Sequence, residues 1–300
     1  MDLKRLRMVR DVCPLLHPHH ASITASRWIV PVAARHRSVA AFAHGHTVAL
    51  FSNRLLTWHR SFTRTADEPP PFDPPSFIYI HEWMPDVVPR VPHDNWRGFG
   101  FSQKQGVAFL KTDVDFTRDW SAQARRQLKI FQRSGAQLRL GTLEEFVSSS
   151  ARSYLPEAVL HHTIDQATTV RAEHPEDLEV LVAADAGGEA LGFFIAAYCA
   201  EVAQSYYVGG CYTAAGARVH AITGLVNWWF ERSIARGLAS VNFGDMCGPR
   251  AISVDPSVGY SNFKTHFGIH RVWRPQTLWK IRVRLFGLQE TAELEGIEVY

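Results

Sequence analysis

The first quarter of the chain alternates short apolar runs with polar turns, a pattern that predicts strands. Turns rich in arginine, histidine and glycine separate these runs, which favours an antiparallel meander of Trp28–Ala34, Val39–Ala43 and Thr47–Phe51. The proline-rich stretch Pro69–Pro75 then excludes both a helix and a central strand. Strands resume at Phe77–His81 and Gly106–Lys111.

From Phe116 onward, apolar residues recur every three to four positions, which predicts a helix. Its apolar face consists of Trp120, Ala124, Leu128 and Phe131, and Gly135 is placed to end it. The opposite face carries the basic residues Arg118, Arg125, Arg126, Lys129 and Arg133. Such a face is either solvated surface or a contact surface for phosphates, and the pattern leaves both interpretations open.

The remaining residues alternate strands and helices in a clear order. The strand Leu138–Leu140 precedes a helix whose start, Thr142-Leu143-Glu144-Glu145, has the spacing of a capping box. The next expected elements are the strands Glu179–Asp185, Ala190–Ala200 and Ser205–Tyr212, the loop Thr213–Arg218, the apolar helix Ala221–Arg236 and the strand Ser240–Gly244. A short helix, Tyr260–Phe267, and a last strand, Val272–Val283, complete the predicted region.

Composition narrows the class of protein. The 300 residues carry a formal net charge of +3, so overall charge does not demand a phosphate-bearing partner. The longest apolar run, Ala190–Ala200, is shorter than the roughly 20 residues of a membrane-spanning helix. No apolar stretch follows the basic N-terminus. We therefore expect a cytoplasmic protein that does not insert into a membrane.

Several kinds of site are excluded by spacing. The four cysteines, Cys13, Cys199, Cys211 and Cys247, form no C-x-x-C pair and are expected to be small core residues. The histidine clusters have no carboxylate or cysteine partner at a ligand spacing, so no metal is expected. The chain contains no G-x-S-x-G elbow, no G-x-x-x-x-G-K-[ST] loop and no strand followed by G-x-G-x-x-G.

Two segments near the end of the chain resemble a known family. They are Ala239-Ser240-Val241-Asn242-Phe243-Gly244-Asp245 and, after a loop, Gly259-Tyr260-Ser261-Asn262-Phe263-Lys264-Thr265-His266-Phe267-Gly268. They are similar to the D-F-G-G and G-[LY]-x-x-F-K-x-x-F-G ending of FemAB peptidoglycan-bridge aminoacyltransferases, which are related to the GNAT acyltransferases. Lysylphosphatidylglycerol synthase domains and other acetyltransferase-like proteins share this ending.

The resemblance implies an α/β fold of two GNAT-like lobes, with mixed, mostly antiparallel sheets flanked by helices. The expected division is a reduced first lobe at 1–115, a linking basic helix at 116–136 and a catalytic lobe at 137–300.

The resemblance also implies an activity. An aminoacyltransferase would move an aminoacyl group from aminoacyl-tRNA to an amine of a cell-wall precursor or of a peptide-like small metabolite. The tRNA would be a co-substrate, and no other cofactor is implied. Two alternatives remain open: an acyl-CoA-dependent N-acyltransferase and a non-catalytic GNAT-like binding module.

The segment Thr213–Arg218 bears on the choice of donor. GNAT enzymes that bind acyl-CoA have a loop similar to [QR]-x-x-G-x-[GA], in which backbone N–H groups hold the pyrophosphate. The chain keeps only Gly216 of these three positions, which favours tRNA over CoA. Arg218 remains a candidate phosphate ligand.

The candidate site residues follow from the matched motif and from chemistry. Aminolysis of an ester needs positive charge or N–H donors where the oxyanion develops. By the resemblance, Lys264 would lie near the acyl carbonyl or the terminal adenosine, and Phe263 is its matched partner. Helical spacing places Phe263 and Phe267 on one face, and Tyr260 with Lys264 on another, which would face the cleft. Phe263 and Tyr260 are candidate substrate-binding residues.

Four further residues are candidates for substrate contact or proton transfer. Asp245 ends a predicted strand, where it could take a proton from the amine or cap the following turn. His220 begins a helix and could bind substrate or serve the structure. Either Tyr206 or Tyr207 faces the substrate, and Tyr207 joins Arg218 and His220 as a substrate-binding candidate. The candidate tRNA contacts are Arg125, Arg126, Lys129 and Arg133.

Overall fold

The chain divides into two compact units, Met1–Gln103 with Val272–Tyr300 and Lys104–Arg271. The computed structural model describes residues 39–42, 45–63, 68–69, 72, 74–85, 96–98, 104–110, 114–150, 160, 163–164, 167–168, 170–172, 174–200, 203–246, 261–273, 277–284 and 291–293. The expected strand Trp28–Ala34 lies outside these residues, as do Cys13 and Cys247.

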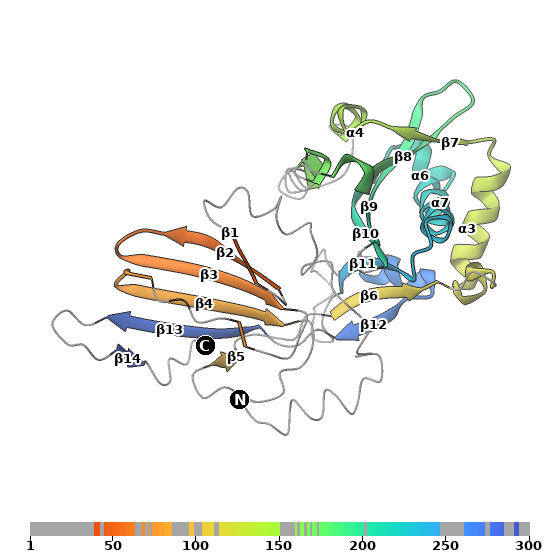
Figure 1. Ribbon diagram of the computed structural model, residues 1–300. Coiled ribbons are helices and arrows are strands. Elements are labelled where there is room, and N and C mark those ends of the chain that lie inside the picture. The colour runs from red at the N-terminus through yellow and green to blue at the C-terminus, as the bar shows by residue number, and fades with distance from the viewer. Residues whose placement is uncertain are drawn as a thin grey trace. The chain divides into compact units, whose positions relative to one another are not determined.

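The first unit is built on one sheet. Its described strands run in the order β1-β2-β3-β4-β13-β14, and β5 also pairs with β13 (Figure 1). Their bounds are β1 (Val39–Phe42), β2 (Gly45–Ser52), β3 (Leu56–Thr63), β4 (Ile78–Pro85), β5 (Arg97–Gly98), β13 (Leu278–Arg284) and β14 (Thr291–Glu293). The antiparallel pairing of β1 with β2 confirms that part of the expected meander.

Strand β3 was not expected from the sequence. One of its faces carries Trp58 and Phe62, and the alternate positions hold Thr57, His59, Ser61 and Thr63. The apolar positions thus alternate with polar ones, but Arg60 interrupts the apolar face, and the polar face is the more buried of the two. β3 pairs antiparallel with β2 and parallel with β4.

The expected last strand, Val272–Val283, is two strands that belong to different sheets. β12 (His270–Trp273) joins the sheet of the second unit, whereas β13 pairs antiparallel with β4 of the first. Pro275 lies between them, and proline cannot donate a hydrogen bond to a ladder. The expectation of one closing strand was therefore wrong. The two units also differ from the expected lobe ranges, because β6 (Lys104–Phe109) lies in the second sheet.

The second unit has a mixed sheet in the order β12-β6-β11-β10-β9-β8-β7. Its other strands are β7 (Gln137–Gly141), β8 (Leu178–Ala184), β9 (Ala190–Cys199), β10 (Gln204–Tyr212) and β11 (Ser240–Met246). Neighbouring strands from β7 to β10 are antiparallel, and β10 and β11 form a parallel pair. The positions of β7 to β11 agree with the strands expected from the sequence.

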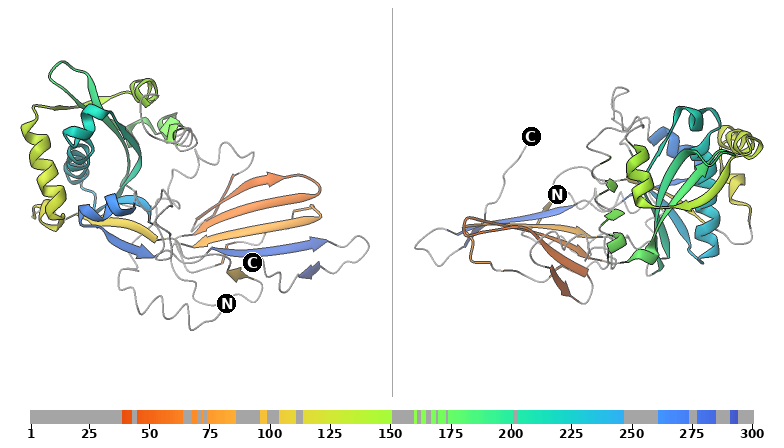
Figure 2. Two further views of the ribbon diagram at one scale, coloured as in Figure 1. Left: turned by 180° about the vertical axis from the view of Figure 1, so that it is seen from behind. Right: turned by 90° about the horizontal axis from the view of Figure 1, so that it is seen from above.

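Two helices cover one face of this sheet. α7 (Ala221–Ala235) is apolar on most sides because it packs between the sheet and α3 (Ala122–Arg133), as Figures 1 and 2 show. Trp229 of α7 lies 4.9 Å from Phe194 of β9, measured between ring centroids. α3 buries Ala124, Leu128 and Phe131, as its periodicity predicted. It belongs to the second unit, and its expected role as a linker stays a prediction.

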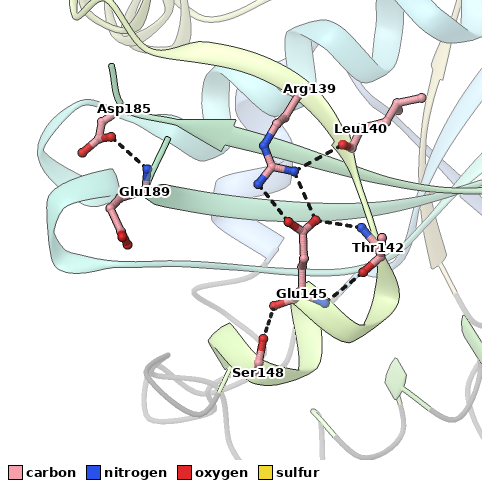
Figure 3. Close-up of polar contacts among 7 residues, drawn as sticks. All are labelled: Arg139, Leu140, Thr142, Glu145, Ser148, Asp185 and Glu189. Atoms are coloured by element: carbon pink, nitrogen blue, oxygen red, sulfur yellow. Dashed lines mark hydrogen bonds and ion pairs between the residues drawn. The ribbon is translucent and has the colours of Figure 1, made fainter. Parts of the chain in front are cut away.

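The capping box expected at residue 142 is present at the start of α4 (Leu143–Ser150). The Glu145 amide donates to the Thr142 hydroxyl at 3.1 Å, and the Thr142 amide donates to the Glu145 carboxylate at 2.9 Å (Figure 3). Arg139 of β7 also donates to both carboxylate oxygens of Glu145, at 3.1 and 3.0 Å. Through Arg139, the capping box therefore connects α4 to β7, the strand at the edge of the sheet. Phe146 of α4 contacts Phe193, on the sheet face opposite to that of Phe194.

Two expectations concern composition. Cys199 and Cys211 are buried, as expected for core residues. Among the described residues, none of the helices has the length and apolar character that a membrane crossing requires.

Glu179 of β8 joins the sheet to the end of α7. Its side chain is 10% exposed and accepts hydrogen bonds from Arg232 and, at 2.7 Å, from Arg236. The Arg236 guanidinium also lies 4.1 Å from the centre of the Tyr198 ring. Burial acts to raise the pKa of the Glu179 carboxyl, but the two arginines outweigh it and hold the pKa below its ordinary value of 4.5.

We predict that Glu179→Gln lowers the free energy of unfolding by about 2 kcal/mol, less than for a fully buried pair because both arginines are about a third exposed. Because the folded-state pKa is depressed, this stabilisation is present above pH 4.5 and is lost as pH falls through the lower folded value. Urea unfolding at pH 7 and at a pH below the folded-state pKa of Glu179 measures both effects. An equal difference between wild type and variant at both pH values would contradict the assignment.

Candidate functional site

The segment that carries the FemAB resemblance forms a short helix and a turn. Residues 261–264 are helical, Thr265–Phe267 is a 3-10 turn, and Gly268 follows with a φ of 66°. Ser261, Lys264 and Phe267 are buried, whereas Asn262 and Thr265 are exposed. The helix expected at Tyr260–Phe267 is thus present, although Tyr260 lies outside the described residues.

Phe267 fixes this segment in the core. Its ring stacks on Phe243 of β11 with centroids 5.5 Å apart, and it meets Trp120 edge to face at 4.9 Å. Phe263 contacts Phe267 at 4.9 Å and packs against the same core, but it is only partly buried. The two rings therefore share a face, as the spacing predicted. The contact with Phe243 brings the two motif segments together.

His266 connects the same turn to the start of α3. Ser121, the N-cap of α3, accepts a hydrogen bond from the Ala124 amide at 3.1 Å, and its hydroxyl lies 2.9 Å from Nδ1 of His266. The Ser121 amide donates to the His266 carbonyl at 2.9 Å. His266 thus has a structural partner, which accounts for its presence without a role in proton transfer.

Lys264 is buried, with 7% of its surface exposed. Lys264 is therefore not a solvated surface lysine. An ammonium group is costly to bury unless polar or charged groups surround it. Lys264 follows Phe263 in the sequence, and the Phe263 ring contacts Phe267. The packing of these rings therefore holds the backbone at Lys264. A charge held in this way is suited to act on a bound group.

The parallel pairing of β10 with β11 stops midway along both strands. It covers three residue pairs and ends at Tyr206 and Asn242, although β10 continues to Tyr212 and β11 to Met246. Both strands are irregular just beyond this point, between Tyr207 and Gly209 and between Asn242 and Asp245. Asp245 lies in this region, but its side chain is outside the described residues.

A chain of buried polar groups holds the two strands where their pairing ends. Gln204 of β10 donates to the Ser240 hydroxyl at 3.0 Å and accepts from the Asn242 amide group at 3.0 Å. The Asn242 side chain in turn accepts the Gly244 backbone N–H at 2.8 Å. Gly244 has a φ of 76°, which favours glycine, and an added Cβ would lie 3.0 Å from the Tyr206 hydroxyl.

These groups were not identified from the sequence. A signal was present, because Asn242 lies between Val241 and Phe243 in an otherwise apolar strand. A polar residue at such a position is usually held by hydrogen bonds.

The two tyrosines of β10 point to opposite faces. Tyr207 packs against the core, with its ring 4.8 Å from Phe194. Tyr206 reaches the backbone of Gly244. Tyr206 is thus the tyrosine beside the irregular end of β11, and the substrate role expected for Tyr207 stays a prediction.

The segment expected to be a loop at Thr213–Arg218 contains a short helix, α6 (Ala214–Arg218), so that expectation was wrong. The Thr213 hydroxyl accepts the Gly216 amide at 3.1 Å and so caps the helix. An added Cβ at Gly216 would lie 1.9 Å from the Leu191 carbonyl oxygen. Close packing on β9 therefore requires this glycine, whatever ligand binds.

Arg218 and His220 lie between α6 and α7. Arg218 is exposed at the end of α6. His220 is half-buried, has a φ of 57° and precedes α7 without a side-chain cap to it. A non-glycine residue in this conformation is uncommon, and such residues concentrate at functional sites.

The basic residues of α3 are exposed, but they differ in their contacts with the rest of the protein. Arg125 donates to the carbonyl oxygens of Arg118 and Trp120, so it supports the start of the helix. Arg126, Lys129 and Arg133 are exposed along the same helix. A polyanion would meet these three charges first.

One group of described residues has ligand atoms close enough to hold a metal ion. His174, Glu176 and Asp177 place these atoms within 4.8 Å of one another on a short 3-10 turn before β8. The Asp177 amide donates to the His174 carbonyl at 3.0 Å, so the turn itself draws these residues together. We assign the group no metal.

Comparison with known proteins identifies the fold. The structure is similar to the crystal structure of FemX, with a TM-score of 0.65 at 8% sequence identity, over 93% of this chain and 96% of that chain. L-PGS from Bacillus licheniformis matches with a TM-score of 0.44 at 13% identity over 67% of each chain. A tandem GNAT protein from the clavulanic acid biosynthesis pathway matches with a TM-score of 0.38 at 12% identity, over 73% of this chain and 64% of that chain.

No protein-family model matches the chain, and no curated protein matches its sequence. The FemX match shows that the chain has a FemX-like fold. The α/β architecture with mixed sheets, expected from the FemAB resemblance, is thereby confirmed. The division into two GNAT-like lobes stays a prediction.

We predict that Phe267→Ala lowers the free energy of unfolding by about 3 kcal/mol or more, because it removes a ring that is 1% exposed and contacts three others. Phe263→Ala is the matched control. It should cost clearly less, since the Phe263 ring is only partly buried. Denaturant unfolding of both variants measures the difference, and equal losses would contradict an anchor at Phe267.

Proposed function

We propose that the chain is an aminoacyltransferase that moves an aminoacyl group from aminoacyl-tRNA to an amine. The acceptor would be a cell-wall precursor or a peptide-like small metabolite. The burial of Lys264 carries this proposal, because it supports a positioned charge within the segment that resembles the FemAB ending, in a chain with a FemX-like fold.

The chemistry requires little beyond charge and position. The amine attacks the ester carbonyl carbon, the carbonyl oxygen becomes an oxyanion, and the ribose hydroxyl of the tRNA leaves as the amide bond forms. Lys264 would stabilise the oxyanion. Asp245, which ends the irregular part of β11, would accept the proton from the attacking amine.

The polar chain beneath the site would position these groups. Asn242 holds the Gly244 amide, and Gln204 holds Asn242. Asp245 follows Gly244 directly, so the direction of the backbone at Asp245 depends on this chain of hydrogen bonds. Tyr206, beside Gly244, and Phe263, beside Lys264, would contact the substrate.

The start of α6 supports tRNA over CoA as the donor. A CoA pyrophosphate would need free backbone N–H groups at this helix start. The Gly216 amide already donates to the Thr213 hydroxyl, so one of the N–H donors at this helix start is occupied. Arg218 is exposed and His220 is half-exposed at the end of this helix. We expect these side chains to contact the acyl donor in place of backbone N–H groups.

We predict that Lys264→Met lowers turnover about 100-fold, because the variant lacks the charge that would stabilise the oxyanion. The assay measures amide product by mass spectrometry with charged tRNA. Arg171→Gln, an exposed substitution in the same unit, is the control and should retain activity. Unchanged turnover of Lys264→Met, with an unchanged melting curve, would remove Lys264 from the mechanism.

We predict that replacing Arg126, Lys129 and Arg133 together by Gln weakens tRNA binding and its salt dependence. Each phosphate neutralised contributes to the slope of log affinity against log salt, so the slope should flatten by roughly 2 to 3. Arg125 is left intact because it supports the start of α3. Filter binding across a salt series measures the slope. If it is the same as for wild type, this face is solvated surface.

A further inference from the structure

A buried histidine lies in the middle of the sheet of the first unit. His81 of β4 is 3% exposed, and its Nε2 atom lies 2.6 Å from the Ser61 hydroxyl of β3. That hydroxyl lies 2.6 Å from the hydroxyl of Thr47 on β2, and both of these residues are buried as well. A chain of three buried polar side chains therefore connects three neighbouring strands (Figure 1).

Aromatic rings cover this chain. The His81 ring meets Trp96 at 5.0 Å and Phe72 at 5.9 Å, both edge to face. Trp96 packs on Trp83, and these two rings form an apolar cluster with Leu278. The imidazole thus lies between a layer of hydroxyl groups and a layer of aromatic rings, which excludes water from it.

The His81 ring has a place for one proton only. In the neutral ring, the Nε2–H group can donate to Ser61, whereas Nδ1 has no hydrogen-bond partner among the described residues. A second proton would turn Nδ1 into a buried donor without an acceptor, which is costly. The geometry of the site therefore fits the neutral ring and opposes the charged one.

The basic groups around His81 oppose a charged ring as well. Register places His59 of β3 and Lys280 of β13 directly beside it, and Arg282 of β13 in the next row. Tyr79, the neighbouring titratable group on this face of β4, lies 5.8 Å from the ring. Burial, and after it the charges of His59, Lys280 and Arg282, lower the pKa of His81 to about 3.

The nearby carboxylates do not offset these charges at the ring. Glu82 lies on the opposite face of β4, where it accepts from an arginine of β3 at 2.5 Å. Glu68 accepts from the Trp96 indole at 2.6 Å. Glu293 of β14 lies opposite an arginine of β13, two strands from His81. A charged His81 would therefore have repulsive neighbours and no ion-pair partner among the described residues.

We propose that the chain of Thr47, Ser61 and His81 is an acid-sensitive lock on the sheet of the first unit. A second proton on the His81 ring does not fit the closed sheet, so protonation drives the ring out of its site and opens β2, β3 and β4. The pKa of an unfolded histidine is about 6.5, and that of His81 in the fold is about 3. The stability that His81 contributes is therefore complete above pH 6.5 and is lost as the pH falls toward 3. The inference is independent of the transferase activity.

The test measures hydrogen exchange of the full chain by mass spectrometry between pH 6 and pH 4, corrected for the intrinsic pH dependence of exchange. If opening takes up one proton, the opening constants of the β2, β3 and β4 amides should rise roughly 50-fold or more over this range. His81→Gln can still bond to Ser61 but cannot be protonated, so it should lose most of this rise. His270→Gln, which replaces an exposed histidine of the second unit, is the matched control and should keep it.

Equal pH dependence of these amides in His81→Gln and His270→Gln would overturn the lock. If His81→Gln fails to fold, imidazole NMR spectra of the wild-type protein decide. The His81 signal should keep its neutral chemical shift until the amides of β2, β3 and β4 lose their protection. A His81 ring that gains a proton near pH 6 while these amides stay protected would also overturn the proposal.

Discussion

The ring of Phe267 contacts three other aromatic rings, and the position of the motif segment depends on these contacts. Phe243 joins the segment to β11, Trp120 joins it to the turn before α3, and Phe263 completes the group. The same cluster continues through Phe230 and Trp229 of α7. One packed core thus holds β11, α3, α7 and the motif segment that contains Lys264. Burial of these rings provides the free energy that fixes a lysine in a position it would not otherwise adopt.

A second constraint acts where β10 and β11 cease to pair. Backbone groups that leave a ladder must find other partners. Here the Asn242 side chain takes the Gly244 amide, and Gln204 connects Asn242 to Ser240. Apolar packing therefore holds the segment of Lys264, and a buried hydrogen-bond chain holds the backbone that leads to Asp245. Rigid supports of both kinds suit a reaction that depends on the placement of charge.

Much of the second unit could be predicted from the sequence, because its elements follow strong periodicities. Leu128 and Phe131 marked a helix face, Thr142 and Glu145 marked a cap, and Phe263 and Phe267 marked one side of a turn. The elements of the first unit were harder to predict from the sequence. In β3, histidine and hydroxyl groups occupy the more buried face, and Arg60 interrupts the apolar one, so the alternation did not show which face belongs to the core. The pairing of β13 with β4 joins residues about 200 positions apart, which no local pattern encodes. The role of Asn242 depends on where β10 and β11 separate, which is a property of the whole sheet.

The proposed donor, aminoacyl-tRNA, distinguishes this transferase from an acyl-CoA enzyme. The most direct measurement incubates the protein with charged total tRNA and candidate amines, with and without prior ribonuclease treatment, and follows the amide product by mass spectrometry. A parallel assay measures free thiol released from acetyl-CoA. An enzyme that uses aminoacyl-tRNA gives a product that ribonuclease abolishes, and it releases no thiol. A product that survives ribonuclease, together with release of CoA thiol, would contradict the proposed donor.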